Sequence, residues 1–448
     1  MVPVQQQRHR TTLAKIKLLH LADIHLGTET YGRLDPNTGL RSRVADFAAC
    51  LDEAVDRALQ EPVDVVIFAG DAYRNQEPNQ TLQREFARRI HRLSGAGVAV
   101  FLLVGNHDLP NSPGRANVVD IFETLSVPNV YVGRSVAVYR IETKNGPLQM
   151  VAVPWRTPSQ LFTLQEYKNK TLAEVNERLE TWVGDKIDAL AQELDPAIPA
   201  VLVAHLSVHG ATAGTESTHV LGYQLNLVKS KVANPAFDYV ALGHIHKHQV
   251  INAHPPVVYA GSIERVDFSE EKDPKGFVLA DVDKGACSWE FVPIEKARKF
   301  ITIRVTAYGE DPLSKVLREI SRHYIEGAIV RVIIETDGAN EPLVNVQEVY
   351  KALKAAYYAR VSLEVQREHR TRFGAEIKEN MTPAEALEKY LQLKDCAPDR
   401  TKVLMEYAER IINPEPLAGV QLSLQPTLTD ATVDAVADEA VDTTEGAE

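Results

Sequence analysis

The sequence predicts an α/β fold: a two-sheet β-sandwich flanked by helices, followed by a small α/β unit and by C-terminal helices. Three observations lead to this expectation. Apolar runs typical of buried strands alternate with amphipathic helical stretches from Ile16 to about Phe291. Near residue 296 a second, shorter alternation begins, and past Arg372 the pattern becomes helical. A chain of 448 residues is long enough for two or three such units.

The predicted sandwich begins with regular alternation of strands and helices over residues 17–108. We interpret this part as one sheet of βαβ type. Later strand-type runs lie closer together, with one long helical stretch at 175–194 between them, and we interpret them as the second sheet. They are 147–155, 200–208, 237–246, 255–263 and 276–283.

From residue 296 onward the pattern is strand, helix, strand, helix, strand, which predicts a small separate α/β unit. The remaining residues form a helical segment and an acidic tail without aromatic residues, which we expect to be disordered. The expected divisions are an N-terminal extension 1–15, a main domain 16–295, the α/β unit 296–375, the helical segment 376–413 and the tail 414–448.

The helical segment contains a capping-box pattern at Thr382, Pro383 and Glu385, which predicts a helix beginning there. Two apolar faces follow at helical spacing. Such faces commonly pack on their own protein, but a position beyond two complete domains favours a surface for a partner. The faces consist of Leu387, Tyr390 and Leu391, and of Val403, Leu404, Tyr407 and Ile411.

Composition limits the possible classes of protein. No apolar run reaches the roughly 18 residues of a membrane span, and the N-terminus lacks a signal-peptide pattern, so we expect a cytoplasmic protein. The formal net charge is −12, and removing the eight acidic residues of the tail leaves −4, which neither supports nor excludes a DNA partner. Cys50, Cys287 and Cys396 are too few for a disulfide framework.

Seven potential metal ligands follow strand-type runs of the main domain. Because the carboxyl ends of parallel strands meet at one edge of a sheet, we expect these side chains to cluster. The ligands occur in five short motifs, and five motifs in this order are a specific signal, whereas Asp-x-His alone would be uninformative. The ligands are Asp23, His25, Asp71, Asn106, His205, His244 and His246, in the motifs D-I-H, G-D, G-N-H-D, H and G-H-I-H.

Carboxylate, amide and imidazole ligands suit two divalent metals of the Mn, Fe or Zn type. Asp71 is the natural bridge between them. One metal would take Asp23, His25 and His246 as its further ligands, and the other would take Asn106, His205 and His244. Two metals about 3.5–4 Å apart can activate an attacking oxygen and stabilise a leaving one, so the expected reaction is phosphoester hydrolysis.

His107 directly follows a predicted ligand, so its imidazole could face the substrate phosphate and act as a catalytic residue. Asp108 could orient that imidazole. His20 lies within a strand-type run and is expected to pack in the sheet. The acidic residues Asp267, Glu270 and Glu271 could extend a metal site, but the neighbouring Lys272 and Lys275 favour a salt-bridged surface loop.

The order of the motifs resembles that of the calcineurin-like metallophosphoesterases. Within this class, further segments are similar to the SbcD family, the nuclease subunits of bacterial SbcCD complexes in DNA double-strand-break repair. The similarity covers roughly residues 16–410. The segments are HLADIHLG (20–27), PNTGLRSRVADF (36–47), AHLSVHGA (204–211) and GSIERVDFSEEKDPKGF (261–277).

The resemblance implies a Mn²⁺-dependent nuclease that acts as an exonuclease and endonuclease on the ends of double-stranded DNA. It also implies a homodimer, associated with the nucleoid and controlled by an SbcC-type ATPase with a coiled coil. The small α/β unit would be a capping domain that contacts DNA, and the C-terminal helices would dock on the base of the coiled coil.

One departure concerns the residue three positions after the bridging aspartate. Archaeal and eukaryotic relatives carry a second histidine there, and this chain has Arg74. Arg74 could contact a phosphate or could be a solvated residue. Arg41 and Arg43, in the loop before the first predicted helix, could also hold DNA phosphates, although an exposed pair at a helix start is the simpler interpretation.

Three functions are compatible with these residues. The first is a DNA nuclease that serves as the catalytic subunit of a repair and recombination complex. The alternative enzyme is a phosphodiesterase or phosphatase that acts on small phosphoesters, although it would need only the main domain. A scaffold that binds DNA and a partner is the third, but it would not require a complete ligand set.

Overall fold

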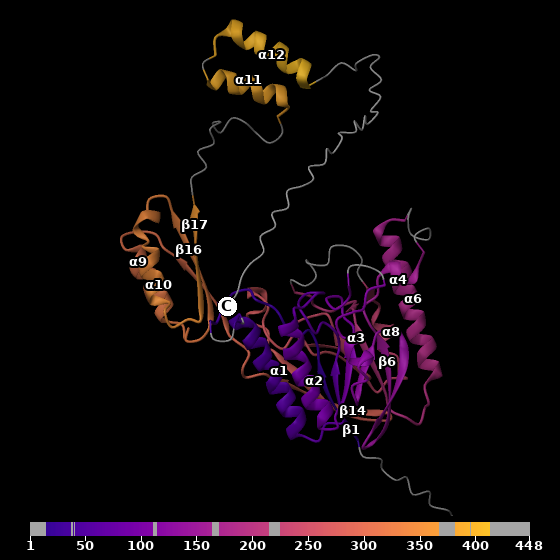
Figure 1. Cartoon of the computed structure of the whole chain (residues 1–448). Coiled ribbons are helices and arrows are strands. Elements are labelled where there is room, and N and C mark those ends of the chain that lie inside the picture. The colour runs from indigo at the N-terminus through magenta and orange to yellow at the C-terminus, as the bar shows by residue number, and fades with distance from the viewer. Residues whose placement is uncertain are drawn as a thin grey trace, which may run out of the picture. The chain divides into compact units, whose positions relative to one another are not determined.

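The computed structural model describes residues 15–36, 39, 41–110, 114–163, 170–214, 225–366, 381–394 and 396–412 (Figure 1). The chain forms two compact units, Met1–Gln366 and Arg367–Glu448. The main domain and the small α/β unit both lie in the first of these. The predicted tail 414–448, and the predicted extension apart from Lys15, lie outside the described residues. Among the described helices, none combines the length and apolarity needed to cross a membrane.

The first sheet of the main domain has six strands in the order β14-β13-β1-β2-β3-β4. Strands β1 to β4 are parallel, and β13 and β14 join as an antiparallel pair beside β1. The strands are β1 (Ile16–Leu21), β2 (Val65–Phe68), β3 (Ala99–Leu103), β4 (Val130–Gly133), β13 (Gly276–Asp283) and β14 (Ala286–Pro293).

Helices α1 (Ser42–Gln60) and α2 (Gln80–Gly95) cover the outer face of this sheet (Figure 1). Both are amphipathic: the buried face of α1 includes Val44, Phe47 and Leu51, at the spacing of successive helical turns. Asn79 begins α2 by accepting a hydrogen bond from the backbone N–H of Leu82. A short helix, α3 (Asp120–Thr124), precedes β4.

The second sheet also has six strands, in the order β11-β12-β10-β7-β6-β5. Its outer face is covered by α6 (Leu172–Glu193), on the side opposite α1 and α2 (Figure 1). The strands are β5 (Ala137–Thr143), β6 (Gly146–Val153), β7 (Ala200–His205), β10 (Tyr239–Gly243), β11 (Gln249–Ala253) and β12 (Pro256–Tyr259). The smaller elements are α4 (Pro158–Leu161), α8 (Lys229–Val232) and the paired strands β8 (Ser207–Val208) and β9 (Asn226–Leu227).

A buried apolar layer joins the two sheets. Ile67 and Phe101 of the first sheet and Met150 and Val201 of the second belong to it, and each is fully buried. The predicted two-sheet sandwich is therefore confirmed. One part of the prediction is wrong: the run 276–283 forms β13 of the first sheet, where it pairs antiparallel with β1. Strand periodicity indicates which face is buried but does not identify the neighbouring strand, which long-range contacts decide.

The small α/β unit has the predicted order of elements. Three parallel strands, in the order β15-β16-β17, pack against two helices. An aromatic cluster of Tyr31, Phe268 and Phe300, with Tyr358 beside it, connects this unit to the main domain. The elements are β15 (Phe300–Thr306), α9 (Pro312–Ser321), β16 (Ile329–Asp337), α10 (Val346–Ala352) and β17 (Tyr358–Gln366), with the 3-10 turn η2 (Glu341–Leu343). A further 3-10 turn, η1 (Phe268–Glu270), belongs to the main domain.

The second compact unit contains α11 (Pro383–Leu393) and α12 (Pro398–Ile412). The capping box of Thr382 and Glu385 is present, as predicted, and Pro383 occupies the first turn. Leu391 and Ala408 are buried within this unit. Most of the predicted apolar face of α12 is exposed: the exposed fraction is 50% for Val403, 61% for Tyr407 and 78% for Ile411.

Candidate metal centre

The candidate centre is built from loops that follow the strands of both sheets. Four predicted ligands there have a left-handed backbone: Asp23 (φ 52°), His25 (φ 46°), Asp71 (φ 55°) and His244 (φ 95°). Non-glycine residues adopt this conformation at a cost of about 1–3 kcal/mol, so it persists only where the surroundings enforce it. Such strain is concentrated at functional sites, so it indicates that this edge of the sandwich is a functional site.

Backbone contacts hold these loops together. The N–H groups of Asp23 and His25 donate to the carbonyl oxygens of Gly70 and Asp71, at 3.1 and 3.0 Å. The N–H of His244 donates to the Asp23 carboxylate at 2.9 Å, which ties the second sheet to the first. The loops approach so closely at Gly105 that a Cβ there would lie 2.1 Å from Oδ1 of Asp71. Glycine is therefore required at this position.

The first group of candidate ligands is Asp23, His25 and His246, whose ligand atoms lie within 4.8 Å of one another. All three side chains are buried. The Nε2 atoms of His25 and His246 face each other at 2.9 Å. Two imidazole nitrogens and a carboxylate converging on one point form a donor set suited to a divalent transition metal.

The second group surrounds Asp71. Its carboxylate lies 3.7 Å from Nε2 of His25 and 3.3 Å from Nε2 of His205. Oδ1 of Asn106 is 3.0 Å from Nε2 of His205 and 3.2 Å from Nδ1 of His244. The structure thus brings all seven predicted ligands together, with Asp71 between the two groups.

Hydrogen bonds on the far side of two imidazoles orient them. Nδ1 of His246 lies 2.7 Å from the Glu270 carboxylate, and Nδ1 of His205 lies 2.8 Å from the carbonyl oxygen of Ala69. With the proton on each Nδ1, the lone pair on Nε2 points into the cluster, as metal binding requires. The donor set therefore fits two divalent cations that share Asp71.

The electrostatics of the cluster also suit bound cations. Burial raises the pKa of Asp23 to about 6, and burial with the nearby Asp71 charge raises the pKa of Asp108 to about 7. Burial lowers the pKa of His244 to about 3, so that imidazole is neutral. Burial also opposes the charge on Asp71, but His205 and His107 outweigh it and hold its pKa well below the usual range. Divalent cations would offset the cost of burying these carboxylates.

His107 lies at the edge of the cluster and is half-buried, unlike the enclosed imidazoles. Its ligand atom lies within 4.8 Å of those of His25 and Asp71. Its Nδ1 is 2.8 Å from the carbonyl oxygen of Arg74, which orients the ring. His107 also lines a cavity of about 420 Å³ together with the Arg74 side chain, so its imidazole is accessible to a substrate.

Asp108 does not orient His107, and that prediction is wrong. Its carboxylate instead accepts hydrogen bonds from three backbone N–H groups, those of Asp71, Ala72 and Gly105, at 2.9, 3.0 and 2.9 Å. These bonds join the G-D loop to the G-N-H-D loop. Asp108 therefore positions the bridging aspartate rather than the neighbouring histidine.

The predicted salt-bridged surface loop at 267–275 is partly wrong. Glu270 and Lys275 do pair, at 2.7 Å, but both side chains are buried. Burial opposes the charge of Glu270, yet Lys275 and His246 outweigh burial and hold the pKa of Glu270 below its usual value. Glu270 was missed as a group that orients His246, because 24 residues separate them and only the fold brings them together.

Trp155 is a second residue that the sequence did not indicate. Its indole lies against the imidazole of His244, with ring centroids 5.0 Å apart, and 6.2 Å from the ring centroid of His205. It closes one side of the cluster against water. Its position directly after β6 and Pro154, at the same edge as the ligands, is the signal that could have found it.

The three arginines predicted to contact substrate have different environments. Arg74 is half-exposed beside His107. Arg41 is exposed and pairs with Glu29 at 2.8 Å. Arg43 is fully buried, where it pairs with Asp46 and Glu264 and its guanidinium lies over the Phe47 ring. Arg43 therefore cannot contact a DNA phosphate in this structure, and that prediction is wrong. His20 packs in the sheet as expected, with Nδ1 3.1 Å from the Tyr239 hydroxyl.

Buried carboxylates, an amide and imidazoles at the strand ends of an α/β sandwich are the ligands of a metal-dependent hydrolase. Residues 16–248, more than half of the chain, match the calcineurin-like phosphoesterases, and the chain belongs to this family.

Two solved structures are similar to parts of the chain. A dimetal phosphatase from Danio rerio has 13% sequence identity and a TM-score of 0.38, over 62% of this chain and 96% of its own. The TT1561 protein of Thermus thermophilus has 12% identity and a TM-score of 0.34, over 62% of this chain and 99% of its own.

Proposed function

We propose that this chain is a Mn²⁺-dependent DNA nuclease that acts as an exonuclease and endonuclease on double-stranded DNA ends. It would be the catalytic subunit of an SbcCD-type DNA repair and recombination complex. The observation that carries the proposal is the structured chain beyond residues 16–248, namely the small α/β unit and the helical pair α11 and α12. Hydrolysis of a small phosphoester needs neither, whereas a large substrate and a protein partner give both a role.

The chemistry follows from the residues at the cluster. Two bound cations would activate the attacking oxygen and stabilise the leaving one. His107, accessible and held by the Arg74 carbonyl, is positioned to neutralise charge on the phosphate or to protonate the leaving oxygen. The Arg74 guanidinium, on the same cavity wall, would contact a non-bridging phosphate oxygen. Asp108 and Glu270 would keep the ligands in place.

The partner surfaces are part of the same proposal. The exposed residues Val403, Tyr407 and Ile411 lie four residues apart on α12 and form one apolar stripe. A stripe of this kind fits a helical partner, such as the base of the coiled coil of an SbcC-type ATPase. The small α/β unit would act as the DNA-contacting cap. We also propose a homodimer that is cytoplasmic and associated with the nucleoid.

The test is degradation of end-labelled linear duplex DNA by the purified chain with Mn²⁺. It is run beside Asp71→Asn, beside His107→Gln and on the small ester bis-p-nitrophenyl phosphate. Shortened DNA that disappears in both variants is the expected result. Cleavage of the ester with intact DNA, also after addition of an SbcC-type ATPase, would contradict the nuclease and leave an enzyme of small phosphoesters.

A further inference from the structure

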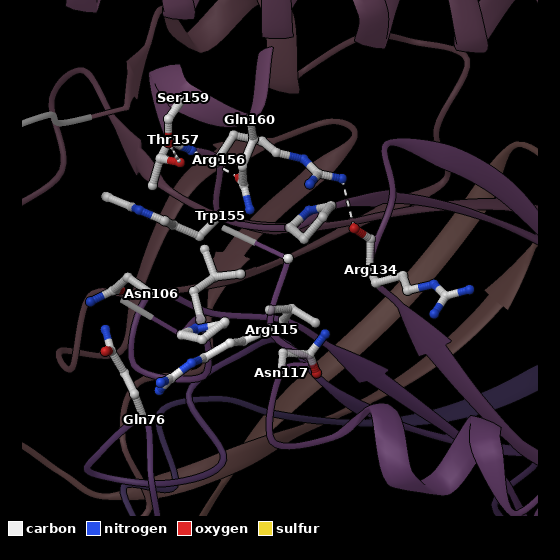
Figure 2. Close-up of a pocket in the computed structure, with 15 residues that line it drawn as sticks. Gln76, Asn106, Arg115, Asn117, Arg134, Trp155, Arg156, Thr157, Ser159 and Gln160 are labelled. Atoms are coloured by element: carbon white, nitrogen blue, oxygen red, sulfur yellow. Dashed lines mark hydrogen bonds between the residues drawn. The ribbon is translucent and has the colours of Figure 1, made fainter. Parts of the chain in front are cut away.

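A second cavity, of about 610 Å³, borders the metal cluster. Asn106 and Trp155 form part of its wall, and these same residues contact the candidate ligands His205 and His244. Figure 2 shows Arg115, Arg134 and Arg156 among the residues that line it, with Gln76 beside Arg115 and Gln160 beside Arg156. The cavity is thus adjacent to the site of chemistry and rich in hydrogen-bond donors.

Two of the three arginines are neutralised by neighbouring carboxylates. Arg115 pairs with Glu77 at 3.0 Å, and Arg134 pairs with Glu123 at 3.1 Å. Arg156 differs, because no carboxylate of the described chain lies within ion-pair distance of it. Its terminal nitrogen donates to the carbonyl oxygen of Arg134 at 2.7 Å, a bond visible in Figure 2.

Arg156 is also partly buried. Its Nε is enclosed and has no hydrogen-bond partner among the described residues. Burial lowers the pKa of its guanidinium, because the charge is partly removed from water. A partly buried cation with no carboxylate partner among the described residues is costly in a folded protein unless an anionic ligand completes its environment. A phosphate offers the planar, charge-assisted hydrogen bonds that a guanidinium prefers.

The two cavities beside the cluster meet at one residue. Gln76 lines both the cavity of Arg156 and the smaller cavity of Arg74 and His107. Arg74, like Arg156, has no carboxylate partner among the described residues. The two cavities are therefore neighbours along the edge of the cluster, and each is lined by one of these two arginines. Trp155 is buried against the histidines, so its ring does not stack on a base.

We propose that the cavity of Arg156 binds a backbone phosphate of the substrate strand next to the phosphate that is cleaved. This inference rests on the proposed nuclease function and gives it a substrate requirement. A strand must carry a second phosphate for full affinity, so the site selects polynucleotides over isolated phosphoesters. The guanidinium contributes binding and positioning, not chemistry at the reacting atoms.

The test compares Arg156→Gln and Arg156→Lys with the control Arg140→Gln, which removes an exposed arginine paired with Glu142 on β5. Each is assayed with Mn²⁺ on labelled duplex DNA and on bis-p-nitrophenyl phosphate. Arg156→Gln should raise KM for DNA about tenfold, as expected for loss of one charge-assisted phosphate contact. The slope of log KM against log salt concentration should fall by about 0.7 to 0.9, the change expected when one phosphate contact is lost. Arg156→Lys should partly restore both the KM for DNA and the salt slope. The rate of ester cleavage should be the same in both variants as in the wild type.

Two outcomes overturn the inference: DNA kinetics and salt slope like those of the control, or equal losses on DNA and ester. The second would mean that Arg156 only supports the fold near the cluster. If the wild-type chain cuts the ester but never DNA, the proposed nuclease function fails instead. Fluorescence anisotropy with a labelled oligonucleotide then still tests whether the cavity of Arg156 binds a phosphate. A tenfold loss of affinity in Arg156→Gln supports that binding, and unchanged affinity contradicts it.

Discussion

The main domain and the small α/β unit are built from similar parts but place their polar residues differently. Both have parallel strands connected by helices. In the main domain Asp23, Asp71 and His244 lie within three residues of a strand end, and each is buried and has a left-handed backbone. In the small unit Arg304 pairs with Glu335 and Glu364 across neighbouring strands in exposed positions. The groups of described side chains that could hold a metal all lie in the main domain.

Parallel-strand architecture therefore does not by itself produce a reactive site. A reactive site arises where polar side chains are buried at the strand ends, because burial makes the pKa of each group depend on the charges beside it. Exposed pairs across a sheet surface remain solvated and are individually worth little. The following predictions test how far the two regions differ.

The largest effect is expected for Asp71→Asn. Loss of the shared carboxylate should reduce hydrolysis of bis-p-nitrophenyl phosphate by at least about a thousandfold, equivalent to about 4 kcal/mol of transition-state stabilisation. The matched change in the small unit is Glu335→Gln, which should leave the rate on this ester unchanged. Steady-state rates with Mn²⁺ measure both. Similar losses in the two variants would erase the distinction between the regions.

Glu270→Gln should have the next largest effect. The amide retains a hydrogen-bonding group near Nδ1 of His246 but removes the charge that Lys275 balances. Loss of such a supporting group typically costs about 10- to 100-fold in metal affinity or activity. Titration of activity with Mn²⁺ should show a higher half-saturating concentration. An unchanged titration would mean that His246 needs no orienting carboxylate.

His20 gives a prediction for pH. Burial lowers its pKa to about 3, so the folded state holds a neutral imidazole. The stability associated with this group is present above the unfolded pKa near 6.5 and is lost as pH falls toward 3. Between about pH 6.5 and about pH 5 the loss should be about 2 kcal/mol. Urea unfolding in the presence of a chelator measures the free energy of unfolding at both pH values. The loss between them should be smaller in His20→Gln than in the wild type. An equal loss in both proteins would mean that His20 is charged in the fold.

The smallest effect is expected for Arg304→Gln. Its ion pairs with Glu335 and Glu364 are solvent-exposed, with 55% of the arginine side chain accessible. Exposed pairs contribute little to stability. The thermal midpoint and the rate on the small ester should match those of the wild type. A lowered midpoint would show that the small unit depends on this pair more than exposure suggests.

Much of the site could be predicted because its ligands lie at strand ends. The apolar runs locate the strands, and the residue after each run follows from the sequence, so Asp23, Asp71 and His205 could be identified together. Glu270 could be named only as a possible extension of a metal site, because its proximity to His246 depends on the turn η1 folding back over the cluster. Arg156 could not be recognised, since its lack of a carboxylate partner among the described residues depends on which side chains the fold places around it.

The burial of Arg43 and the role of Asp108 have the same origin. An arginine at a helix start looks exposed in sequence, but the small α/β unit covers it: the guanidinium of Arg43 lies over the ring of Phe300. An aspartate after a histidine looks like its partner, but its carboxylate turns to the backbone of another loop.

Local sequence determined where the strands and helices of this protein lie, which residues follow each strand, and hence its phosphoester chemistry. These features depend on the spacing of apolar residues, on helix-capping residues and on the order of residues along the chain, all of which act over a few residues. Tertiary structure alone decided which sheet β13 joins, which carboxylate orients His246 and that the Nε of Arg156 is enclosed without a hydrogen-bond partner among the described residues. These depend on contacts between residues far apart in the chain, because burial and pairing are properties of the assembled fold.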